Sequence, residues 1–273
     1  MYLAIDIGGT KTLVASLNNE GVISEKIRFE TPESYEKFLE NLAETVAKLS
    51  TDNFLACGVG MPGRLDRVHG RGVALGNLPW KNIPIKKDIQ KVAGCPVVVD
   101  NDANVAGLSE AMLVKDRYNR VLYVTVSTGI GTGIIVDQAI DPAFADSEGG
   151  HMMLEHDDRL RPWESFASGH AIVARYGKKA QDITSDETWK HIARDLTTGL
   201  IDLIAVVQPE VIIIGGSVGH YLERFKKPLV ESLKQYETPL VPIPPIHEAQ
   251  RPDDAVLYGC YDLAKSVYGK THS

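Results

Sequence analysis

The sequence predicts an α/β fold made of two similar units, and three features of the chain support this prediction. A pair of apolar runs interrupted by glycines opens the chain at 2–17, and a second such pair occupies 121–136. In both halves, strand-like segments then alternate with helical ones. This order is typical of sheets covered by helices, and the repeated hairpin indicates that one unit duplicates the other.

Within the first unit, short apolar runs bounded by turn residues predict strands at 2–7, 12–17, 22–29, 54–61 and 96–99. Thr31 and Pro32 predict the start of a helix, because they are favoured at the N-cap and in the first turn. The apolar face of that helix is formed by Tyr35, Phe38, Leu39, Leu42, Val46 and Leu49. Two further helices are expected, one carrying Ile85, Ile89 and Val92 and one over 102–114.

The second unit is predicted to repeat this order. We expect strands at 121–126, 132–136 and 211–214, a glycine turn at 127–131, and helices at 188–207 and 255–268. We place a small N-terminal domain at 1–117 and a larger C-terminal domain at 118–254. The closing helix, about 255–273, is expected to pack back on the first domain. Two facing units predict a ligand site in an interdomain cleft.

The composition favours a globular protein with a small-molecule partner. The 273 residues are 44% hydrophobic, and the formal net charge is -7. This charge argues against a protein that neutralises nucleic-acid phosphates. No stretch approaches the ~18 apolar residues of a membrane span, and no basic leader is evident. Cys57, Cys95 and Cys260 form neither a disulfide framework nor a metal-binding pair, so we expect a cytoplasmic enzyme without a membrane role.

The motif at the first hairpin suits a nucleoside triphosphate. It joins the strand-end carboxylate of Asp6 to Gly8, Gly9, Thr10 and Lys11 within one turn. Glycines let backbone N–H groups approach phosphate oxygens, and Asp6 could hold Mg²⁺ directly or through water. The alternative is an ordinary hairpin turn with incidental polar residues.

A corresponding turn of small and hydroxyl residues opens the second half. Its candidate phosphate contacts are Thr128, Gly129, Gly131, Thr132 and Gly133. A single glycine turn is weak evidence, but its repetition at the equivalent place in a duplicated unit strengthens the prediction of a phosphate site.

Polar residues gather where a buried strand is expected to meet a helix, at Asn101 and Asp102. Side chains at such a junction project into the cleft that the strand ends face, so Asp102 is a candidate general base. The alternative is that Asp100, Asn101 or Asp102 only caps the helix. Both roles can coexist in the cluster.

Two carboxylates and an imidazole, those of Glu148, Glu164 and His151, could bind vicinal hydroxyl groups such as those of a sugar. The alternative for each is an ordinary surface residue. A metal site is a further alternative, formed by His151, Glu155, His156, Asp157 and Asp158, although their spacing is not that of a rigid metal motif.

Taken together, these segments resemble the ROK family of repressors, uncharacterised frames and sugar kinases. The match spans nearly the whole chain through short motifs in the family order. They are DIGGTK at 6–11, MPGRLD at 61–66, NLPW at 77–80, DNDAN at 100–104, STGIGTG at 127–133, EGGH at 148–151, WESFASG at 163–169, PEVIIIGG at 209–216 and AVLYG at 255–259. The resemblance implies a two-domain actin-like ATPase (ribonuclease H-like) fold with duplicated βββαβαβα units.

The resemblance also implies roles for individual residues in an ATP-dependent, glucokinase-like hexose kinase. Asp102 would take the proton from the primary hydroxyl of the sugar. The other sugar contacts would be Gly63, Asn77, Asn101, Glu148, His151 and Glu164. ATP and Mg²⁺ would be held by Asp6, Gly8, Gly9, Thr10, Lys11 and the 128–133 turn, with Gly215 and Gly216 near the nucleoside. A homodimer is a further expectation from the family.

One departure from the family pattern concerns zinc. Many members hold a structural zinc with the histidine of EGGH and three cysteines, whose places fall here on Glu155, Asp157 and Pro162. We therefore expect no structural zinc, and we expect packing of Trp163 and Phe166 to hold the segment instead. The loss resembles a zinc-free branch that includes enzymes using polyphosphate, which makes polyphosphate an alternative donor.

Competing functions remain open at this stage. A sugar-responsive repressor would carry a helix-turn-helix module ahead of the kinase-like part, whereas the first predicted strand here begins at residue 2. A catalytically silent sugar-binding protein would not need Asp6, Lys11 and Asp102 together. Among substrates, glucose is our first expectation, followed by mannose, fructose, allose and the N-acetylhexosamines.

Overall fold

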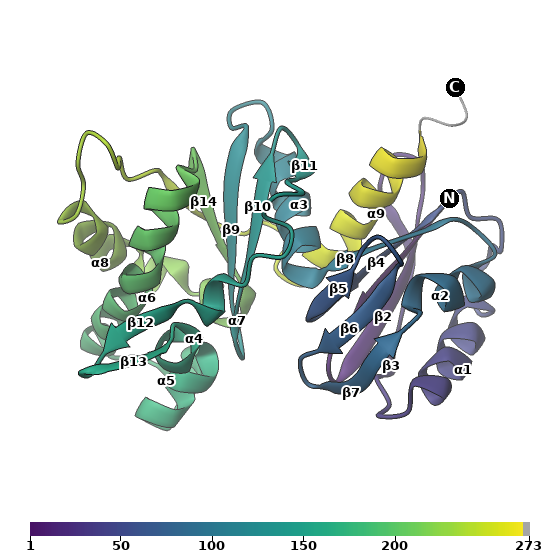
Figure 1. Ribbon diagram of the computed structural model, residues 1–273, viewed down its shortest axis with the longest axis horizontal. Helices are drawn as coiled ribbons and strands as arrows, with labels where there is room; N and C mark the ends of the chain where they lie inside the picture. The colour runs from purple at the N-terminus through teal and green to yellow at the C-terminus, as the bar shows by residue number, and fades with distance from the viewer. Residues whose placement is uncertain (270–273) are drawn as a thin grey trace. The chain divides into compact units, whose positions relative to one another are not determined.

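The computed structural model describes residues 1–269 and divides into two compact units (Figure 1). Unit 1 is formed by residues 1–109 together with the segment that begins at Asp254, and unit 2 by residues 110–253. The end of the predicted closing helix, 270–273, lies outside the described residues.

Unit 1 contains a five-stranded sheet in the order β3-β2-β1-β4-β8. Its strands are β1 (Tyr2–Ile7), β2 (Lys11–Leu17), β3 (Ile23–Glu30), β4 (Cys57–Met61) and β8 (Val97–Asn101). The first three strands pair in antiparallel fashion, whereas β4 pairs in parallel with both β1 and β8. The carboxyl ends of β1, β4 and β8 therefore meet at one edge of the sheet.

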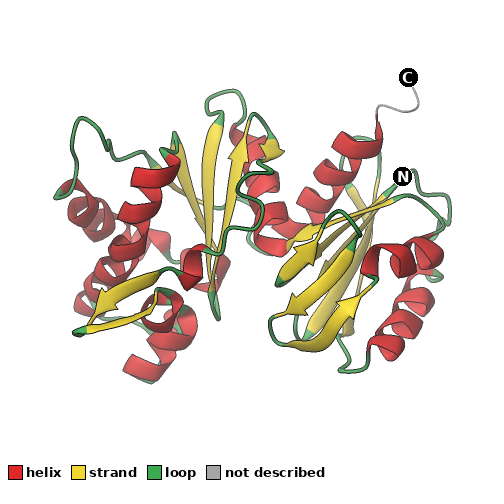
Figure 2. Ribbon diagram, viewed as in Figure 1, coloured by secondary structure: helices red, strands yellow, loops and turns green. Residues whose placement is uncertain are grey.

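Helices cover both faces of this sheet, as Figure 2 shows. They are α1 (Tyr35–Val46), α2 (Ile85–Ala93), α3 (Asp102–Val114) and α9 (Ala255–Tyr268). Alternate residues of β1 serve the two faces: Leu3, Ile5 and Ile7 pack in the core with α1 and α2, and Tyr2 and Ala4 pack in the core with α9. Successive side chains of a strand point to opposite faces of the sheet, so β1 contributes to the helix layers on both faces.

A three-stranded sheet adds to unit 1 between β4 and α2. Its strands are β5 (Arg64–Asp66), β6 (Arg71–Leu75) and β7 (Leu78–Ile83). It joins the core through Trp80, which packs against Phe38 at 4.8 Å between ring centroids and donates from Nε1 to the carbonyl oxygen of Glu33 at 2.8 Å. The sequence analysis did not predict this sheet.

Unit 2 repeats the five-stranded sheet, in the order β11-β10-β9-β14-β15. Its strands are β9 (Arg120–Val126), β10 (Ile130–Val136), β11 (Ala139–Ile140), β14 (Val211–Gly215) and β15 (Ile246–Glu248). As in unit 1, the first three strands pair in antiparallel fashion. Strand β14 pairs in parallel with both β9 and β15, as β4 does with β1 and β8. The predicted duplication of the α/β unit is confirmed at the level of strand order and direction.

The rest of unit 2 packs around the buried rings of Trp163, Trp189 and Phe225. Its helices are α4 (Glu164–Ala167), α5 (Gly169–Tyr176), α6 (Asp186–Val207), α7 (Gly216–Gly219) and α8 (Leu222–Lys234), with 3₁₀ turns at Gly149–His151 and Ala180–Asp182. A hairpin of β12 (Met153–His156) and β13 (Arg159–Pro162) precedes α4.

Some predicted element boundaries are wrong. Helix α1 begins at Tyr35 and not at Thr31, because Ser34 is the N-cap and its Oγ accepts from the amide of Lys37. Thr31 instead continues the strand edge, where its amide donates to Thr10 and its hydroxyl pairs with that of Thr12 at 2.8 Å. Strand β4 begins at Cys57, three residues later than predicted.

Every helix within residues 1–269 is too short or too polar to cross a membrane.

Helix α9 lies so close to its neighbours that glycines are required at the contacts. A Cβ atom at Gly58 of β4 would lie 2.0 Å from the carbonyl oxygen of Cys260, and one at Gly259 would lie 1.8 Å from that of Val105 in α3. Both obstacles are backbone atoms, so a side chain could be accommodated only by moving whole elements apart.

We predict that Gly259→Ala lowers the free energy of unfolding by about 2–3 kcal/mol, because the added methyl group separates α9 from α3. Urea unfolding followed by circular dichroism measures this change. Gly269→Ala is the control, since its Cβ would meet side-chain atoms and not backbone: those of Lys265 at 3.2 Å and the Tyr2 hydroxyl group at 3.3 Å. Equal stability of the two variants would contradict the close packing of α9.

Candidate active site

The carboxyl ends of the parallel strands in unit 1 bring together three of the segments that the sequence singled out. Asp6 of β1 pairs with Gly60 of β4, and Gly60 pairs with Asp100 of β8. A Cβ atom at Gly60 would lie 3.8 Å from the Cα atom of Asp102. Side chains at such an edge face the same region, as in other open α/β sheets that bind ligands there.

The opening glycine turn connects β1 to β2 and stays accessible. The amide of Gly8 donates to the carbonyl oxygen of Lys11 at 2.9 Å, while Gly9, Thr10 and Lys11 are exposed. A Cβ atom at Gly9 would lie 3.4 Å from the Cβ atom of Asn77, which is exposed in the turn between β6 and β7. The structure thus places one predicted sugar contact beside the predicted phosphate turn.

The carboxylate of Asp6 lies in a strongly acidic environment. Its pKa is raised to about 7, mainly by burial and further by the negative charges of Asp102 and Asp254, while the charge of Lys11 lowers it. Burial disfavours the charged carboxylate, and the neighbouring Asp102 acts in the same direction.

Asn101 and Asp102 occupy the junction between β8 and α3. Asn101 Nδ2 donates to the carbonyl oxygen of Gly63 at 3.2 Å, and Asn101 Oδ1 accepts from the amide of Ala103 at 2.9 Å. Asp102 Oδ1 accepts from the same amide at 2.8 Å. Both side chains therefore cap the helix. Capping does not exclude catalysis by Asp102, because the residue is partly exposed.

The second glycine turn, in unit 2, connects β9 to β10 and is shorter than predicted. Strand β10 begins at Ile130, so Gly131, Thr132 and Gly133 belong to the strand. The side chain of Thr132 is buried, and its Oγ1 accepts from the amide of Gly149 at 3.2 Å. Thr128 is exposed and Gly129 partly exposed in the turn itself.

Gly215 and Gly216 lie beside this turn, because β14 is the parallel neighbour of β9. Gly216 has a φ of 84°, and a Cβ atom there would lie 2.6 Å from both Ser127 Oγ and the carbonyl oxygen of Val126. The amide of Ser217 donates to Ser127 Oγ at 3.1 Å. The ends of β9 and β14 thus form one loop cluster with exposed backbone.

The three side chains proposed for sugar hydroxyl groups are also assembled within unit 2. His151 Nδ1 lies 3.7 Å from Glu164 Oε1, and Glu164 Oε2 accepts from the amide of Ile130 at 3.2 Å. Burial raises the pKa of the Glu148 carboxyl group. The charge of His151 acts to lower this pKa, and the charge of Glu164 acts to raise it. Glu164 therefore links these sugar candidates to the second glycine turn.

The predicted site residues thus fall into two assembled sets. In unit 1 the set comprises Asp6, Gly8, Gly9, Thr10, Lys11, Gly63, Asn77, Asn101 and Asp102. In unit 2 it comprises Thr128, Gly129, Gly131, Thr132, Gly133, Glu148, His151, Glu164, Gly215 and Gly216. Each set contains candidates for both phosphate and sugar.

Comparison with known proteins identifies the family. A family model described as the ROK family matches residues 2–267. The chain belongs to the ROK family.

Individual sugar kinases resemble the chain over most of its length. The glucokinase of Streptomyces coelicolor is 27% identical and covers 97% of this chain and 98% of its own. The fructokinase of Zymomonas mobilis is 31% identical over 81% of this chain and 80% of its own. The ROK family glucokinase of Streptomyces griseus, solved in complex with glucose and AMPPNP, has a TM-score of 0.81 at 26% identity, covering 97% of this chain and 99% of that one. This likeness confirms the predicted actin-like ATPase fold.

The segment from 152 to 169, where many ROK members have zinc-binding cysteines, is fixed here to helix α6. Asp195 is the central residue: its Oδ1 lies 3.3 Å from His156 Nε2, its Oδ2 accepts from Arg175 at 2.5 Å, and its carbonyl oxygen accepts from Trp163 Nε1 at 3.1 Å. His156 also stacks on Phe166, with ring centroids 4.1 Å apart. We refer to these contacts as the Asp195 clasp.

Burial of Trp163 and Phe166 confirms the packing that the sequence analysis expected for this segment. Trp163 lies against Gly199 of α6, where a Cβ atom would come within 2.2 Å of the indole ring. The alternative metal site at 151–158 is not assembled: among residues 1–269, no group of three or more His, Cys, Asp or Glu side chains could hold a metal ion. Absence of zinc stays a prediction.

Sequence reasoning missed several residues that support the site. Arg67 forms an ion pair with Asp100 at 2.8 Å, and Asp254 both pairs with Lys26 at 2.8 Å and raises the pKa of Asp6. Asp195 was not singled out either. Their partners are distant in the sequence, so no local pattern connected them.

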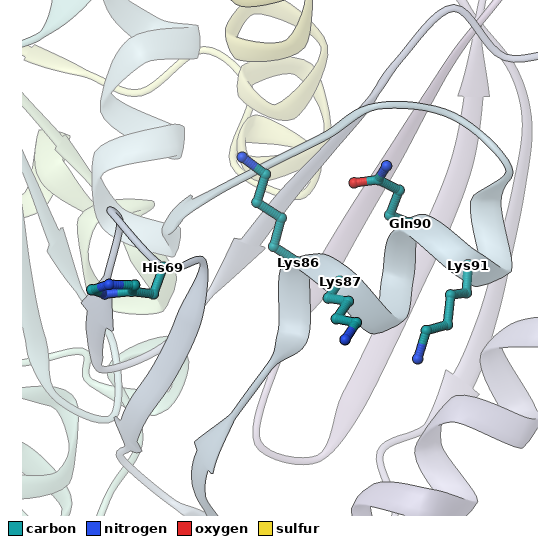
Figure 3. A pocket seen from close by; sticks show the side chains of 5 residues that line it. All are labelled: His69, Lys86, Lys87, Gln90 and Lys91. Carbon is teal, nitrogen blue, oxygen red and sulfur yellow. The ribbon is translucent and has the colours of Figure 1, made fainter.

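A surface cavity of about 420 Å³ lies between the β5–β6 loop and α2, lined by His69, Lys86, Lys87, Gln90 and Lys91 (Figure 3). The lysine side chains point in different directions, and Lys91 is paired with Asp88 at 3.0 Å. The arrangement does not converge on a single point as an anion site would require.

We predict that Asp6→Asn stabilises the metal-free protein increasingly as pH rises. The pKa of Asp6 is about 7 in the folded protein and near 3.8 when unfolded, so the folded state holds the proton more tightly and ionisation above pH 4 costs stability. The stability gap between the variant and the original protein should widen by about 2 kcal/mol from pH 5 to pH 8 and level off above pH 7.5.

Thermal unfolding in EDTA over this pH range measures the gap. Asp52→Asn, at an exposed position of the same unit, is the control for a lost surface charge. A gap that does not change with pH would contradict the raised pKa of Asp6.

We predict that Asp195→Ala lowers the free energy of unfolding by about 1–3 kcal/mol, because it removes the carboxylate that pairs with the largely buried His156 and with Arg175. The carbonyl oxygen that accepts from Trp163 is retained in the variant. Hydrogen exchange should also become faster in β12 and β13. Asp158→Asn in the turn of the same hairpin is the control, since Asp158 is exposed and asparagine tolerates its φ of 57°. Unchanged exchange in the hairpin would show that the clasp does not hold it.

Proposed function

We propose that this chain is an ATP-dependent hexose kinase that phosphorylates the primary hydroxyl group of a glucose-type sugar. Membership of the ROK family, with glucokinase and fructokinase relatives, supports a sugar kinase. The observation that carries the assignment of residues is the register at the strand ends of unit 1. It sets the phosphate-type turn after Asp6 beside the Asn101–Asp102 junction.

In the proposed reaction, Asp102 accepts the proton of the primary hydroxyl group as the sugar oxygen attacks the γ-phosphorus of ATP. The bond from this oxygen to phosphorus forms, the bond from phosphorus to the β,γ-bridging oxygen breaks, and ADP leaves with that electron pair. Since the transition state of phosphoryl transfer is loose, orientation of the hydroxyl group is the main contribution of Asp102. Its partial exposure and its place at a helix N-terminus leave it accessible to a substrate.

We assign the remaining sugar hydroxyl groups to residues of both units. Asn101, Gly63 and Asn77 would contribute from unit 1, and Glu148, His151 and Glu164 from unit 2. The hydrogen bond from Asn101 to Gly63 and the ion pair of His151 with Glu164 support these two groupings.

The phosphates are assigned to the two glycine turns. Gly8, Gly9, Thr10 and Lys11 would serve from unit 1, and the 128–133 segment with Gly215 and Gly216 from unit 2. The hydroxyl group of Thr132 is buried and accepts from the amide of Gly149. We therefore assign phosphate binding at this position to the backbone and not to the hydroxyl group. Lys11 is exposed and can place its charge against a triphosphate.

Mg²⁺ fits the acidic environment of Asp6, which we propose as its protein ligand, directly or through water. The ion would neutralise charge on the transferring phosphate oxygens. The neighbouring carboxylates support this assignment, because Asp102 and Asp254 add to the effect of burial in raising the pKa of Asp6, and a cation would offset their repulsion.

The proposal also specifies the sugar and the phosphate donor. Glucose is our first assignment, ahead of mannose, fructose, allose and the N-acetylhexosamines, since a glucokinase relative aligns over 97% of the chain. Polyphosphate is the alternative donor, because the zinc-type cysteines of the family are absent from this sequence. A sugar-responsive regulator is the alternative outside enzymology, because the same family includes repressors.

A coupled assay for ADP release, run over these sugars, tests the function. We predict turnover with glucose and ATP, and we predict that Asp102→Asn lowers kcat by ~10²-fold or more while the KM for the sugar changes little. A parallel assay with polyphosphate, read as sugar phosphate formed, tests the donor.

Asp52→Asn is the control for the charge change and should retain full turnover. Undiminished kcat in Asp102→Asn would remove Asp102 from its proposed role. Sugar binding without turnover on any substrate of the panel would favour the silent binder or the regulator.

A further inference from the structure

We propose that Arg67 is a positioning residue for the proposed catalytic turn, acting through the buried carboxylate of Asp100. The inference rests on the proposed function, in which Asn101 binds the sugar and Asp102 is the base. It concerns a residue outside that set, located in the loop that joins β5 to β6.

Asp100 is the hydrogen-bonding centre of the junction between β8 and α3. Its Oδ1 accepts from Arg67 Nη2 at 2.8 Å, from the amide of Asn101 at 2.7 Å and from Asn104 Nδ2 at 2.9 Å. Its Oδ2 accepts from Arg67 Nε at 2.9 Å. The side chain of Asp100 is only 9% exposed, so its charge is compensated by these donors and not by water.

These contacts fix both sides of the turn that carries the base. Asp100 holds the amide of Asn101 on one side and the side chain of Asn104, in the first turn of α3, on the other. Asp102 lies between these two attachment points. A shift of the Asp100 carboxylate would therefore move the backbone from which Asp102 projects.

The loop that carries Arg67 is itself fixed by contacts of the neighbouring residues. Asp66 accepts from the amide of His69 at 3.0 Å and lies 2.7 Å from His69 Nδ1. The carbonyl oxygen of Gly70 accepts from the amide of Lys86 at 3.1 Å, and Gly70 leaves room for the Lys86 stem, which would lie 2.6 Å from a Cβ atom. Figure 3 shows Lys86 on α2, with His69 on the facing loop. The loop is thus anchored to α2 at one end and to Asp100 at the other.

The geometry explains why an arginine suits this position. Two parallel hydrogen bonds from a planar guanidinium group set both the distance and the orientation of a carboxylate, which a single ammonium group cannot do. The positive charge also balances Asp100 in a region where Asp102 and Asp254 already raise the pKa of Asp6. Arg67 therefore contributes orientation and charge balance together.

Steady-state kinetics of Arg67→Gln, Arg67→Lys and the double variant Arg67→Gln/Asp102→Asn test the proposal. We expect Arg67→Gln to lower kcat by ~10–100-fold, because small displacements of a catalytic group have effects of that size. The KM for ATP should stay within about threefold, and Arg67→Lys should recover part of the loss. Arg28→Gln, at an exposed position on β3 of the same unit, is the control and should behave as the original protein.

The double variant distinguishes positioning from a general structural role. If Arg67 acts through Asp102, Arg67→Gln should reduce kcat by less than about threefold once Asp102 is asparagine. The same factor of loss in both backgrounds would overturn the proposal, as would wild-type kcat in Arg67→Gln. Should Arg67→Gln fail to fold, as judged by its melting curve, Arg67→Lys in both backgrounds gives the same comparison.

The two proposals fail in different ways. Full activity of Asp102→Asn alone would refute the proposed base. A large loss in Asp102→Asn together with no loss in Arg67→Gln or Arg67→Lys would refute only the role of Arg67.

Discussion

The parallel register of β1, β4 and β8 is the constraint on which the candidate site of unit 1 depends. It aligns Asp6, Gly60 and Asp100 across three strands, so that the first glycine turn and the Asn101–Asp102 junction leave the sheet at the same edge. The central position must be glycine, because Val256 of α9 would lie 2.4 Å from a Cβ atom at Gly60. Residues that are distant in the sequence are adjacent here through backbone pairing alone, which does not require any bound ligand.

The parts of the fold that the sequence predicted well are those with a strong local pattern. Strands β1 and β9 are continuous apolar runs, and α6 and α9 carry clear helical periodicity, so their positions agree with the structure to within a few residues. The small sheet of β5, β6 and β7 was missed because its strands are short and irregular. Both of its pairings contain register shifts, and Asn82 has a φ of 52°. Such strands have no regular alternation of apolar and polar residues to detect.

For the candidate site, motifs located the loops but not the contacts that hold them. The glycines of the second turn led to a turn that was too long, since Gly131 and Gly133 have little strand propensity of their own and pairing with β9 determines their conformation. The Asp195 clasp joins residues up to 39 positions apart, and its chemistry is that of an ordinary histidine, arginine and tryptophan. Only the folded chain shows that these side chains meet at α6.

The discontinuity of unit 1 has a consequence for biosynthesis. Helix α9 covers β1 and β4 from the end of the chain, with Cys260 hydrogen-bonded to the carbonyl oxygen of Ile5 across 255 positions. Unit 2 is formed by a single continuous stretch and has its own core, so it can mature while the ribosome is still translating. The face of the N-terminal sheet that packs against α9 therefore stays uncovered until residues 255–268 have been synthesised.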